Sequence, residues 1–188
     1  MLRVSFRWLP SASFPSLRGR KPALVGLAAA VIVLAGCGSG GHKASASDVQ
    51  RVSGDGYRFS APSSWSVHRA GRQVTATSGS VDLVGVTTFT LARPYRPALW
   101  TKAVPALDRT AAALAAQLGG NLRARATVVV AGRRARRYEI GYRRDGKALV
   151  ERTAFVLAGR GEHQLLCRFA SGGDDGACRT LFSSFRLG

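Results

Sequence analysis

PALWTKAVPALDRTAAALAAQLGG, residues 97–120, carries apolar side chains at the spacing of successive α-helical turns. They occupy one face of the predicted helix: Trp100, Val104, Leu107, Ala111, Leu114, Ala115 and Leu118. We expect regular helix to begin at Pro105, because proline is well tolerated in a first turn. Asp108 then lies near the positive end of the helix dipole, and Gly119–Gly120 ends the helix. A membrane-binding helix would have a similar face, but packing against a sheet is the preferred interpretation.

Short segments rich in β-branched and aromatic residues flank this helix on both sides. Four precede it and four follow it: YRFSAP (57–62), WSVHRAG (65–71), QVTATS (73–78) and VDLVGVTTFTLA (81–92), then LRARATVVV (122–130), RRARRYEIGYR (133–143), KALVERTAFVLA (147–158) and HQLLCRFA (163–170). Ala131–Gly132, Asp145–Gly146 and Gly159–Arg160–Gly161 predict tight hairpin turns between the last four. Consecutive strands with few helices indicate an α+β domain with an antiparallel sheet.

A second amphipathic helix is predicted near the end of the chain, with Asp174 or Asp175 as its N-cap. Its apolar positions follow the i, i+3, i+4, i+7 pattern: Cys178, Leu181, Phe182 and Phe185. The predicted order is therefore ββββ-α-ββββ-α, and each helix must cover part of the sheet with its apolar face.

This order, together with the opening YRFSAPSSW (57–65) and the ending SSFRL (183–187), resembles the PsbP/Mog1-like α/β/α sandwich. Many actinobacterial lipoproteins look similar. The resemblance covers residues 56–188, and it implies that Trp65 and Phe185 are core residues. Functions in this family include photosystem II extrinsic subunits, Ran-binding proteins and mycobacterial surface lipoproteins, so the fold does not choose among them.

An apolar run, ALVGLAAAVIVLA (23–35), follows an N-terminal segment that is basic and free of acidic residues. As a helix the run would span about 20 Å, whereas a bilayer core needs roughly 20 residues. It ends in Leu34-Ala35-Gly36-Cys37, which resembles the lipobox of bacterial lipoproteins. The resemblance implies that the Cys37 thiol receives a diacylglycerol and that signal peptidase II cleaves before this residue. The new amino group is often acylated as well, for example with palmitate.

The sequence therefore predicts three parts. Residues 1–36 are a signal peptide, residues 37–56 are the lipidated cysteine with a flexible Gly/Ser tether, and residues 57–188 are the α+β domain. The expected location is the extracytoplasmic face of the cell membrane, held by acyl chains. The alternative, an uncleaved membrane anchor, is less favoured because the apolar run is short.

Cys167 and Cys178 are the other two cysteines of the chain. Export places them in an oxidising compartment, and they form an even pair once Cys37 is lipidated. We therefore predict a structural disulfide, which stabilises the fold by roughly 3 kcal/mol in the chain-entropy model. A redox-active pair is less favoured, because such pairs usually have C-x-x-C spacing.

Basic residues dominate the charge of the chain, with 28 Lys and Arg against 10 Asp and Glu. Six arginines crowd the region that follows the first helix: Arg133, Arg134, Arg136, Arg137, Arg143 and Arg144. They are candidates for an anion-binding face toward phospholipid headgroups, an acidic polymer or an acidic protein. The preferred interpretation is a solvated sheet surface in an Arg-rich, GC-rich proteome. Nucleic acid is not an expected partner outside the cell.

No catalytic, metal-binding or cofactor-binding motif is found. Residues 141–148, GYRRDGKA, approach a phosphate-binding loop, but Ala148 lacks the hydroxyl for Mg²⁺ and the segment joins two strands. His42, His68 and His163 are isolated from other metal-ligand types at suitable spacing.

We therefore expect a membrane-anchored lipoprotein with a non-catalytic binding or scaffolding domain at the cell envelope. The alternatives are an envelope hydrolase or transferase with a spatially assembled site, an electrostatic binder of anionic envelope polymer or lipid, and a PsbP-like photosystem role. Converging His, Ser and carboxylate side chains in a pocket would favour the hydrolase.

Overall fold

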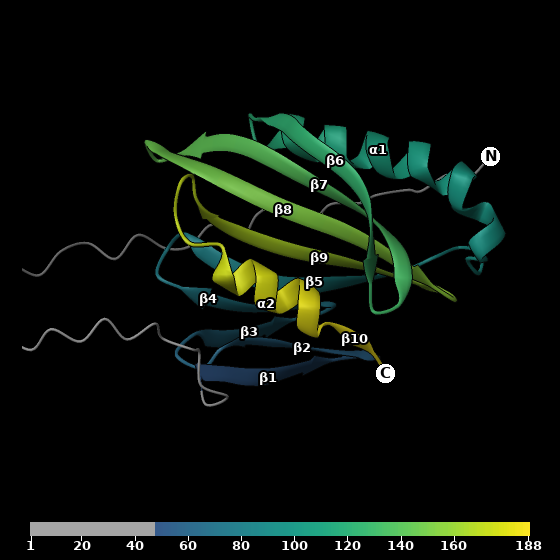
Figure 1. The fold of residues 1–188 in the computed structure, drawn as a ribbon, viewed down its shortest axis with the longest axis horizontal. Helices are drawn as coiled ribbons and strands as arrows, with labels where there is room; N and C mark the ends of the chain where they lie inside the picture. The colour runs from purple at the N-terminus through teal and green to yellow at the C-terminus, as the bar shows by residue number, and fades with distance from the viewer. Residues whose placement is uncertain (1–47) are drawn as a thin grey trace, which may run out of the picture. The chain divides into compact units, whose positions relative to one another are not determined.

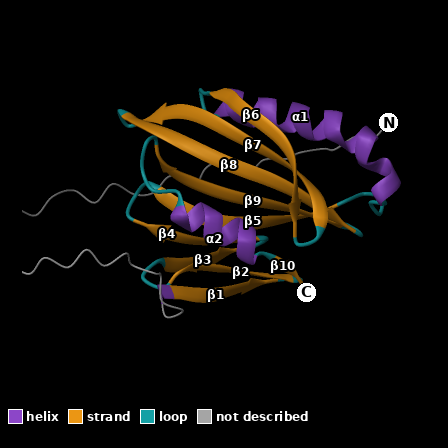
Figure 2. Cartoon of the chain, viewed as in Figure 1, coloured by secondary structure: helices purple, strands orange, loops and turns teal. Residues whose placement is uncertain are grey.

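A seven-stranded antiparallel sheet is the centre of the computed structural model, which describes residues 48–188 (Figure 1). In spatial order its strands are β3 (Ser66–Ala70), β4 (Gln73–Ser78), β5 (Asp82–Thr90), β9 (Gly161–Ala170), β8 (Lys147–Ala158), β7 (Arg133–Arg144) and β6 (Asn121–Val130). A smaller sheet contains β1 (Val49–Gly54), β2 (Tyr57–Pro62) and β10 (Arg186–Leu187) in the order β1-β2-β10. The helices are α1 (Trp100–Gln117), preceded by the 3₁₀ turn η2 (Pro97–Leu99), and α2 (Gly176–Ser184) (Figure 2).

The helix α1 carries the chain from the middle of the large sheet to its edge. Strand β5 ends in the interior of the sheet, and after α1 the chain re-enters at the outer strand β6. Strands β6 to β9 then form an antiparallel meander that returns to pair β9 with β5. This path places four sequential strands on one side of β5 and explains the predicted strand–helix–strand order.

One face of the large sheet is covered by α1. Side chains alternate along β7, so Tyr138, Ile140 and Tyr142 all point to this face. Trp100 and Leu107 of α1 pack with Tyr138, while Leu114 and Ala115 pack with Ile140 and Tyr142. Because Trp100 packs near the end of β8 and Leu114 near its start, α1 runs along the length of the strands.

The opposite face is covered by α2 and the small sheet (Figure 1). Phe59 of β2, Leu181 of α2 and Phe185 are almost fully buried against Val84 and Leu165 of the large sheet. Two covered faces of one antiparallel sheet give the α+β sandwich that the sequence predicts. Burial of Phe185 agrees with its expected core role.

The tether prediction is wrong for residues 49–54, which form β1. The strand pairs with β2 along its whole length, from Val49 opposite Pro62 to Gly54 opposite Tyr57. Only Val52 of this strand is buried, so hydrophobic alternation gives almost no signal. An edge strand held mainly by backbone pairing is difficult to detect from composition. The lipobox residues Leu34, Ala35, Gly36 and Cys37 lie outside the described residues.

The first helix also begins earlier than expected. Helix α1 starts at Trp100 and contains Pro105, which cannot donate a backbone hydrogen bond. The first turn forms nonetheless, because the Trp100 N–H bonds to the Pro97 carbonyl and the Trp100 ring is buried. Asp175 is the N-cap residue of α2, but the side chain that accepts a hydrogen bond there is Asp174, from the Gly176 N–H at 2.9 Å.

The predicted hairpin turns are confirmed at β6–β7 and β7–β8. Both central residues of each turn have positive φ, 50° and 70° at Ala131–Gly132 and 51° and 76° at Asp145–Gly146. This is the type I′ geometry that matches the twist of the strands.

The predicted disulfide is also present. Cys167 of β9 and Cys178 of α2 are bonded, with their Cα atoms 5.5 Å apart. Both residues are buried, so the bond ties α2 to the sheet from within the core.

Candidate functional site

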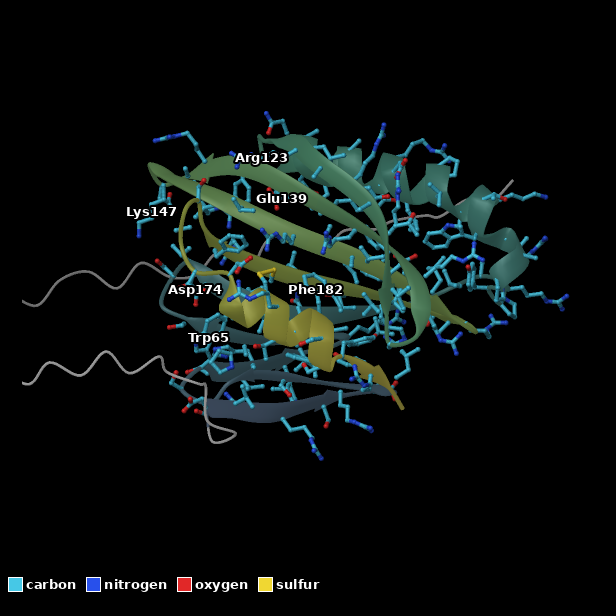
Figure 3. The ribbon with its side chains drawn as sticks, viewed as in Figure 1. Trp65, Arg123, Glu139, Lys147, Asp174 and Phe182 are labelled. Carbon is cyan, nitrogen blue, oxygen red and sulfur yellow. A yellow bond between two sulfur atoms is a disulfide. The ribbon has the colours of Figure 1, made fainter. Side chains whose placement is uncertain are left out.

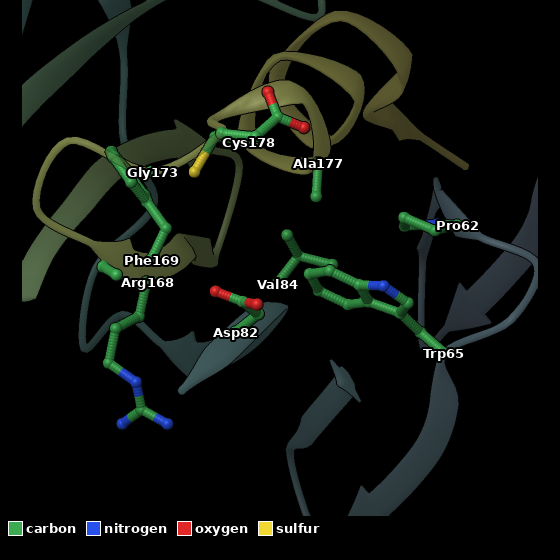
Figure 4. A pocket seen from close by; sticks show the side chains of 11 residues that line it. Pro62, Trp65, Asp82, Val84, Arg168, Phe169, Gly173, Ala177 and Cys178 are labelled. Atoms are coloured by element: carbon green, nitrogen blue, oxygen red, sulfur yellow. The ribbon is translucent and has the colours of Figure 1, made fainter. Parts of the chain in front are cut away.

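A pocket of about 280 Å³ opens beside the first turn of α2 (Figure 4). Its walls come from the end of β2, the β2–β3 turn, the start of β5, the end of β9 and the first turn of α2. The lining residues are Pro62, Trp65, Asp82, Val84, Arg168, Phe169, Ala170, Gly173, Asp174, Ala177 and Cys178. The pocket therefore combines residues that are more than 100 positions apart in the sequence.

Two sets of bonds hold the pocket walls in place. The Gln50 side chain donates to the carbonyls of Pro62 at 2.9 Å and Trp65 at 2.6 Å, which fixes the β2–β3 turn. The disulfide between Cys167 and Cys178 fixes the start of α2 on the other side. The pocket is therefore built on rigid elements and is not a gap between mobile loops.

Asp82 is the polar group of the pocket that has a free hydrogen-bonding capacity. Its carboxylate has no side-chain hydrogen bond or ion pair with residues 48–188. The Trp65 indole is half-buried and extends toward Val84 and Asp82 (Figure 4). An aromatic surface beside a free carboxylate can hold a ligand with one apolar face and a hydroxyl or amine donor.

The other charged residues of the pocket are already engaged. Arg168 donates from Nε to the Val81 carbonyl at 2.8 Å, and its guanidinium is directed away from Trp65 (Figure 4). Asp174 accepts from the Gly176 N–H and lies 3.8 Å from the Arg179 guanidinium. Asp82 is therefore the acceptor that lies beside the Trp65 indole.

A network of four charges anchors the wall formed by α2. Arg152 of β8 donates to Glu139 of β7 at 2.9 Å and to Asp175 at 2.6 Å, and Asp175 also pairs with Arg179. The Arg152 guanidinium lies over the Phe169 ring, 5.0 Å from its centroid. Arg152 thus joins the sheet to the helix that borders the pocket.

The six arginines singled out in the sequence do not form one surface. Arg133 and Arg134 lie beside the β6–β7 turn, and Arg143 and Arg144 lie beside the β7–β8 turn at the other end of β7. Strand β7 contains 12 residues, so these ends are separated by about 40 Å at roughly 3.3 Å per residue. Arg137 is exposed between them.

Arg136 has a structural role on the α1 side of the sheet. It donates to the two carboxylate oxygens of Asp108 at 2.9 and 3.3 Å, and the Tyr138 hydroxyl donates to Asp108 at 2.6 Å. The hydrogen bond from Arg136 is the main cause that lowers the pKa of Asp108. The sequence placed Asp108 at a helix end, but its partners come from the sheet that the helix covers.

A bulge in β6 brings a further arginine to the opposite face. The register of β6 against β7 shifts between Leu122 and Ala124, so Arg123 is the extra residue. A side chain at Gly141 would overlap the Arg123 guanidinium, which shows that Arg123 lies across that glycine. No sequence signal marks the bulge.

Three titratable side chains are buried in β8 and β9, away from the pocket. Burial raises the pKa of Glu162 to about 7 and raises the pKa of Glu151. Burial lowers the pKa of His163, whose Nδ1 lies 3.3 Å from the Thr88 hydroxyl. Within residues 48–188, no group of three His, Cys, Asp or Glu side chains is placed to hold a metal ion. Neither helix of this part of the chain is long and apolar enough to cross a membrane.

The fold resembles known structures although the sequence has little in common with theirs. No model of a protein family matches the sequence, and no curated protein matches it. The solution structure of cyanobacterial PsbP (CyanoP) from Synechocystis superposes with a TM-score of 0.55 at 16% identity, covering 82% of this chain and 99% of that one. The fold is PsbP-like. The likeness agrees with the predicted α+β sandwich.

Two further structures are similar. A Bacteroides thetaiotaomicron protein aligns with a TM-score of 0.51 at 10% identity. The alignment covers 71% of this chain and 45% of the Bacteroides protein. LpqN of Mycobacterium tuberculosis, involved in cell envelope biogenesis, aligns with a TM-score of 0.46 at 12% identity, over 74% of this chain and 91% of its own. At these identities the comparisons describe the fold, and a site must be argued from the residues of this chain.

The sequence resemblance implied that Trp65 is a core residue, and the structure modifies this. Trp65 packs against the core on one side but also lines the pocket. Asp82 was not singled out in the sequence, because a single Asp at the start of a strand has no distinguishing pattern. Only the meeting of Asp82, Trp65 and α2 in space identifies the pocket.

Proposed function

We propose that this chain is a lipid-anchored protein of the bacterial cell envelope whose PsbP-like domain binds a ligand without catalysis. The observation that carries the anchor is the Leu34-Ala35-Gly36-Cys37 sequence after a basic segment and a short apolar run. The disulfide between Cys167 and Cys178 supports export, because such bonds persist in oxidising compartments. The likeness to CyanoP extends to the fold alone, so we propose no role in a photosystem.

Anchoring is tested by changing the lipidated sulfur. The wild-type chain expressed in a bacterial host should partition into the detergent phase of a Triton X-114 separation. The Cys37→Ser chain cannot accept a thioether-linked diacylglycerol, so it should lose this lipid. Equal incorporation of a radiolabelled fatty acid into both chains would contradict the proposal.

The proposed ligand-binding site is the pocket at Trp65 and Asp82. Its lining contains neither His nor Ser, so it gives no support to the hydrolase alternative. The ligand should place an apolar face on the indole and donate a hydrogen bond to the Asp82 carboxylate. A neutral sugar unit of the envelope combines both features, since its C–H face is apolar and its hydroxyls donate.

Trp65 fluorescence tests this site directly. Titration with N-acetylglucosamine and related envelope sugars should change the emission of Trp65, while Trp100 of α1 is buried against the other face of the sheet. Asp82→Asn should weaken binding by about tenfold or more, because a hydrogen bond to a charged acceptor is lost. Asp145→Asn is the matched control, since it removes the same charge at a turn that favours Asn. Equal affinities in the two variants would contradict the site.

A further inference from the structure

The chain outside the described domain joins it at one end, which we call the anchor-proximal end. Val49 at the start of β1 pairs with Pro62. Pro62 lines the pocket together with Ala170, Ala170 pairs with Leu149 of β8, and Leu149 pairs with Tyr142 of β7. The β7–β8 turn that follows Tyr142 therefore lies at this end, as Figure 1 also shows.

This turn carries three exposed basic side chains, and the charge of Arg144 also acts to lower the pKa of the buried Glu151. Arg143, Arg144 and Lys147 are exposed, and none forms an ion pair with an acidic residue of 48–188. Arg143 donates to the Gly146 carbonyl at 2.8 Å, and Arg144 lies 5.6 Å from the Tyr142 ring centroid. Asp145 is the one acidic residue between them, so the turn has a net charge of +2.

Other charged residues at this end lie on other elements than the turn. Arg123 adds a positive charge across Gly141. Asp174 and Asp175 lie at the start of α2, where Arg179 pairs with both, and Asp82 lies in the pocket wall. Lys147 projects at the outer tip of the sheet, and Arg123 lies farther along the sheet on β6 (Figure 3). We call the four exposed basic side chains of this end, Arg123, Arg143, Arg144 and Lys147, the cationic surface.

The short chain before Asp48 keeps the anchor-proximal end of the domain close to the membrane. Only residues 38–47 separate Cys37 from the described domain, and even a fully extended chain of this length spans less than about 40 Å. The other end of the large sheet lies about 40 Å farther away, since β8 has 12 residues. Electrostatic attraction to a surface is screened within about 10 Å at physiological salt. The cationic surface lies at the end that the chain joins, where short-range attraction to the membrane can act.

We infer that this cationic surface docks on anionic phospholipid headgroups beside the lipid anchor. The inference rests on the proposed lipid anchor. Docking fixes the orientation of the domain, which the anchor alone would leave free. It also assigns a role to Arg143 and Arg144 that Arg133 and Arg134, at the distant turn, do not share.

Two lysines report on docking within one molecule. Lys147 belongs to the cationic surface, whereas Lys102 is exposed in the first turn of α1, near the distant end. The acylated protein is placed in vesicles of phosphatidylcholine alone or with 30% phosphatidylglycerol. Acetylation of each lysine is then followed by mass spectrometry. Lys147 should react about fivefold more slowly on the anionic vesicles, Lys102 should be unchanged, and 0.5 M salt should abolish the difference.

Two double variants distinguish docking by this surface from an effect of the total charge of the domain. Arg143→Gln with Arg144→Gln should abolish the protection of Lys147, because it removes half of the cationic surface. Arg133→Gln with Arg134→Gln removes the same charge from the other turn of β7 and should preserve the protection. Both pairs leave the type I′ turn residues intact, and formation of the Cys167–Cys178 disulfide reports correct folding.

Each result has a definite meaning. Protein that floats with the vesicles but shows equal reactivity of Lys147 on both lipid mixtures overturns docking and leaves the anchor standing. Protection of Lys147 by an added anionic wall polymer, and not by anionic vesicles, overturns it in favour of a polymer. Protein that does not float with either vesicle lacks the anchor, and this overturns the proposed function together with the docking that depends on it.

Discussion

Glu162 should make the stability of the domain decrease between about pH 5 and pH 8. The side chain lies between Phe89 of β5 and Leu157 of β8, and is 4% exposed. Its Oε1 atom has no hydrogen-bond partner among residues 48–188. Burial raises its pKa to about 7, compared with 4.5 for an exposed glutamate. The folded state therefore retains a proton that the unfolded state releases over this range.

The magnitude follows from the two pKa values. A difference from 4.5 to about 7 corresponds to roughly 3 kcal/mol at about 1.4 kcal/mol per pH unit. The stability that protonated Glu162 contributes is fully present below pH 4.5. It decreases as pH rises, and the decrease is complete above about pH 7. His163 acts in the opposite direction: its lowered pKa makes the folded state less stable as pH falls below 6.5. A comparison of variants is therefore needed to isolate Glu162.

Glu162→Gln isolates the effect because glutamine does not titrate. Free energies of unfolding are measured in urea at pH 5, 6, 7 and 8 by tryptophan fluorescence for both chains. The wild type should lose about 2.5 kcal/mol relative to the variant between pH 5 and pH 8, because part of the loss already occurs below pH 5. Burying the glutamine amide can change the free energy of unfolding of the variant, but this change is the same at every pH. The difference in pH dependence between the two chains is therefore unaffected. Parallel pH curves for the two chains would refute the reasoning.

Three further changes should alter the stability of the domain, each measured by urea unfolding. Ala131→Asn should stabilise it by about 0.5–1 kcal/mol, because Ala131 has a φ of 50° that alanine adopts with strain; a loss of stability would show that the turn is not type I′. Cys167→Ser combined with Cys178→Ser should destabilise it by about 3 kcal/mol, and an unchanged stability would show that the bond does not form. Gly85→Ala should destabilise it by about 1–3 kcal/mol, since a Cβ there would lie 2.7 Å from the Val74 carbonyl oxygen, and a neutral effect would contradict the β4–β5 packing.

Strands with local turn signals were predictable from the sequence. The bounds of KALVERTAFVLA match β8 at both ends, because Asp145–Gly146 and Gly159 mark the turns on either side. Strand β1 was missed, since one buried valine in six residues gives no alternation. A strand can thus be located from the sequence when turn residues mark both of its ends. It is missed when its stability comes mainly from pairing with another strand.

The candidate site could not be predicted from the sequence for a similar reason. Trp65, Asp82 and Ala177 meet only because α2 packs across β5 and the β2–β3 turn. The arginines illustrate the reverse case: Arg133 and Arg144 are close in sequence but lie at opposite ends of one strand. Proximity along a β-strand does not make a surface, because each residue advances the chain by about 3.3 Å.

Intact-mass spectrometry of the protein isolated from bacterial membranes shows whether Cys37 carries a covalent lipid. We expect a mature chain that begins at Cys37 and carries the added mass of a diacylglyceryl group, with or without a further acyl chain. An N-terminal peptide in which Gly36 is still joined to an unmodified Cys37 would contradict it.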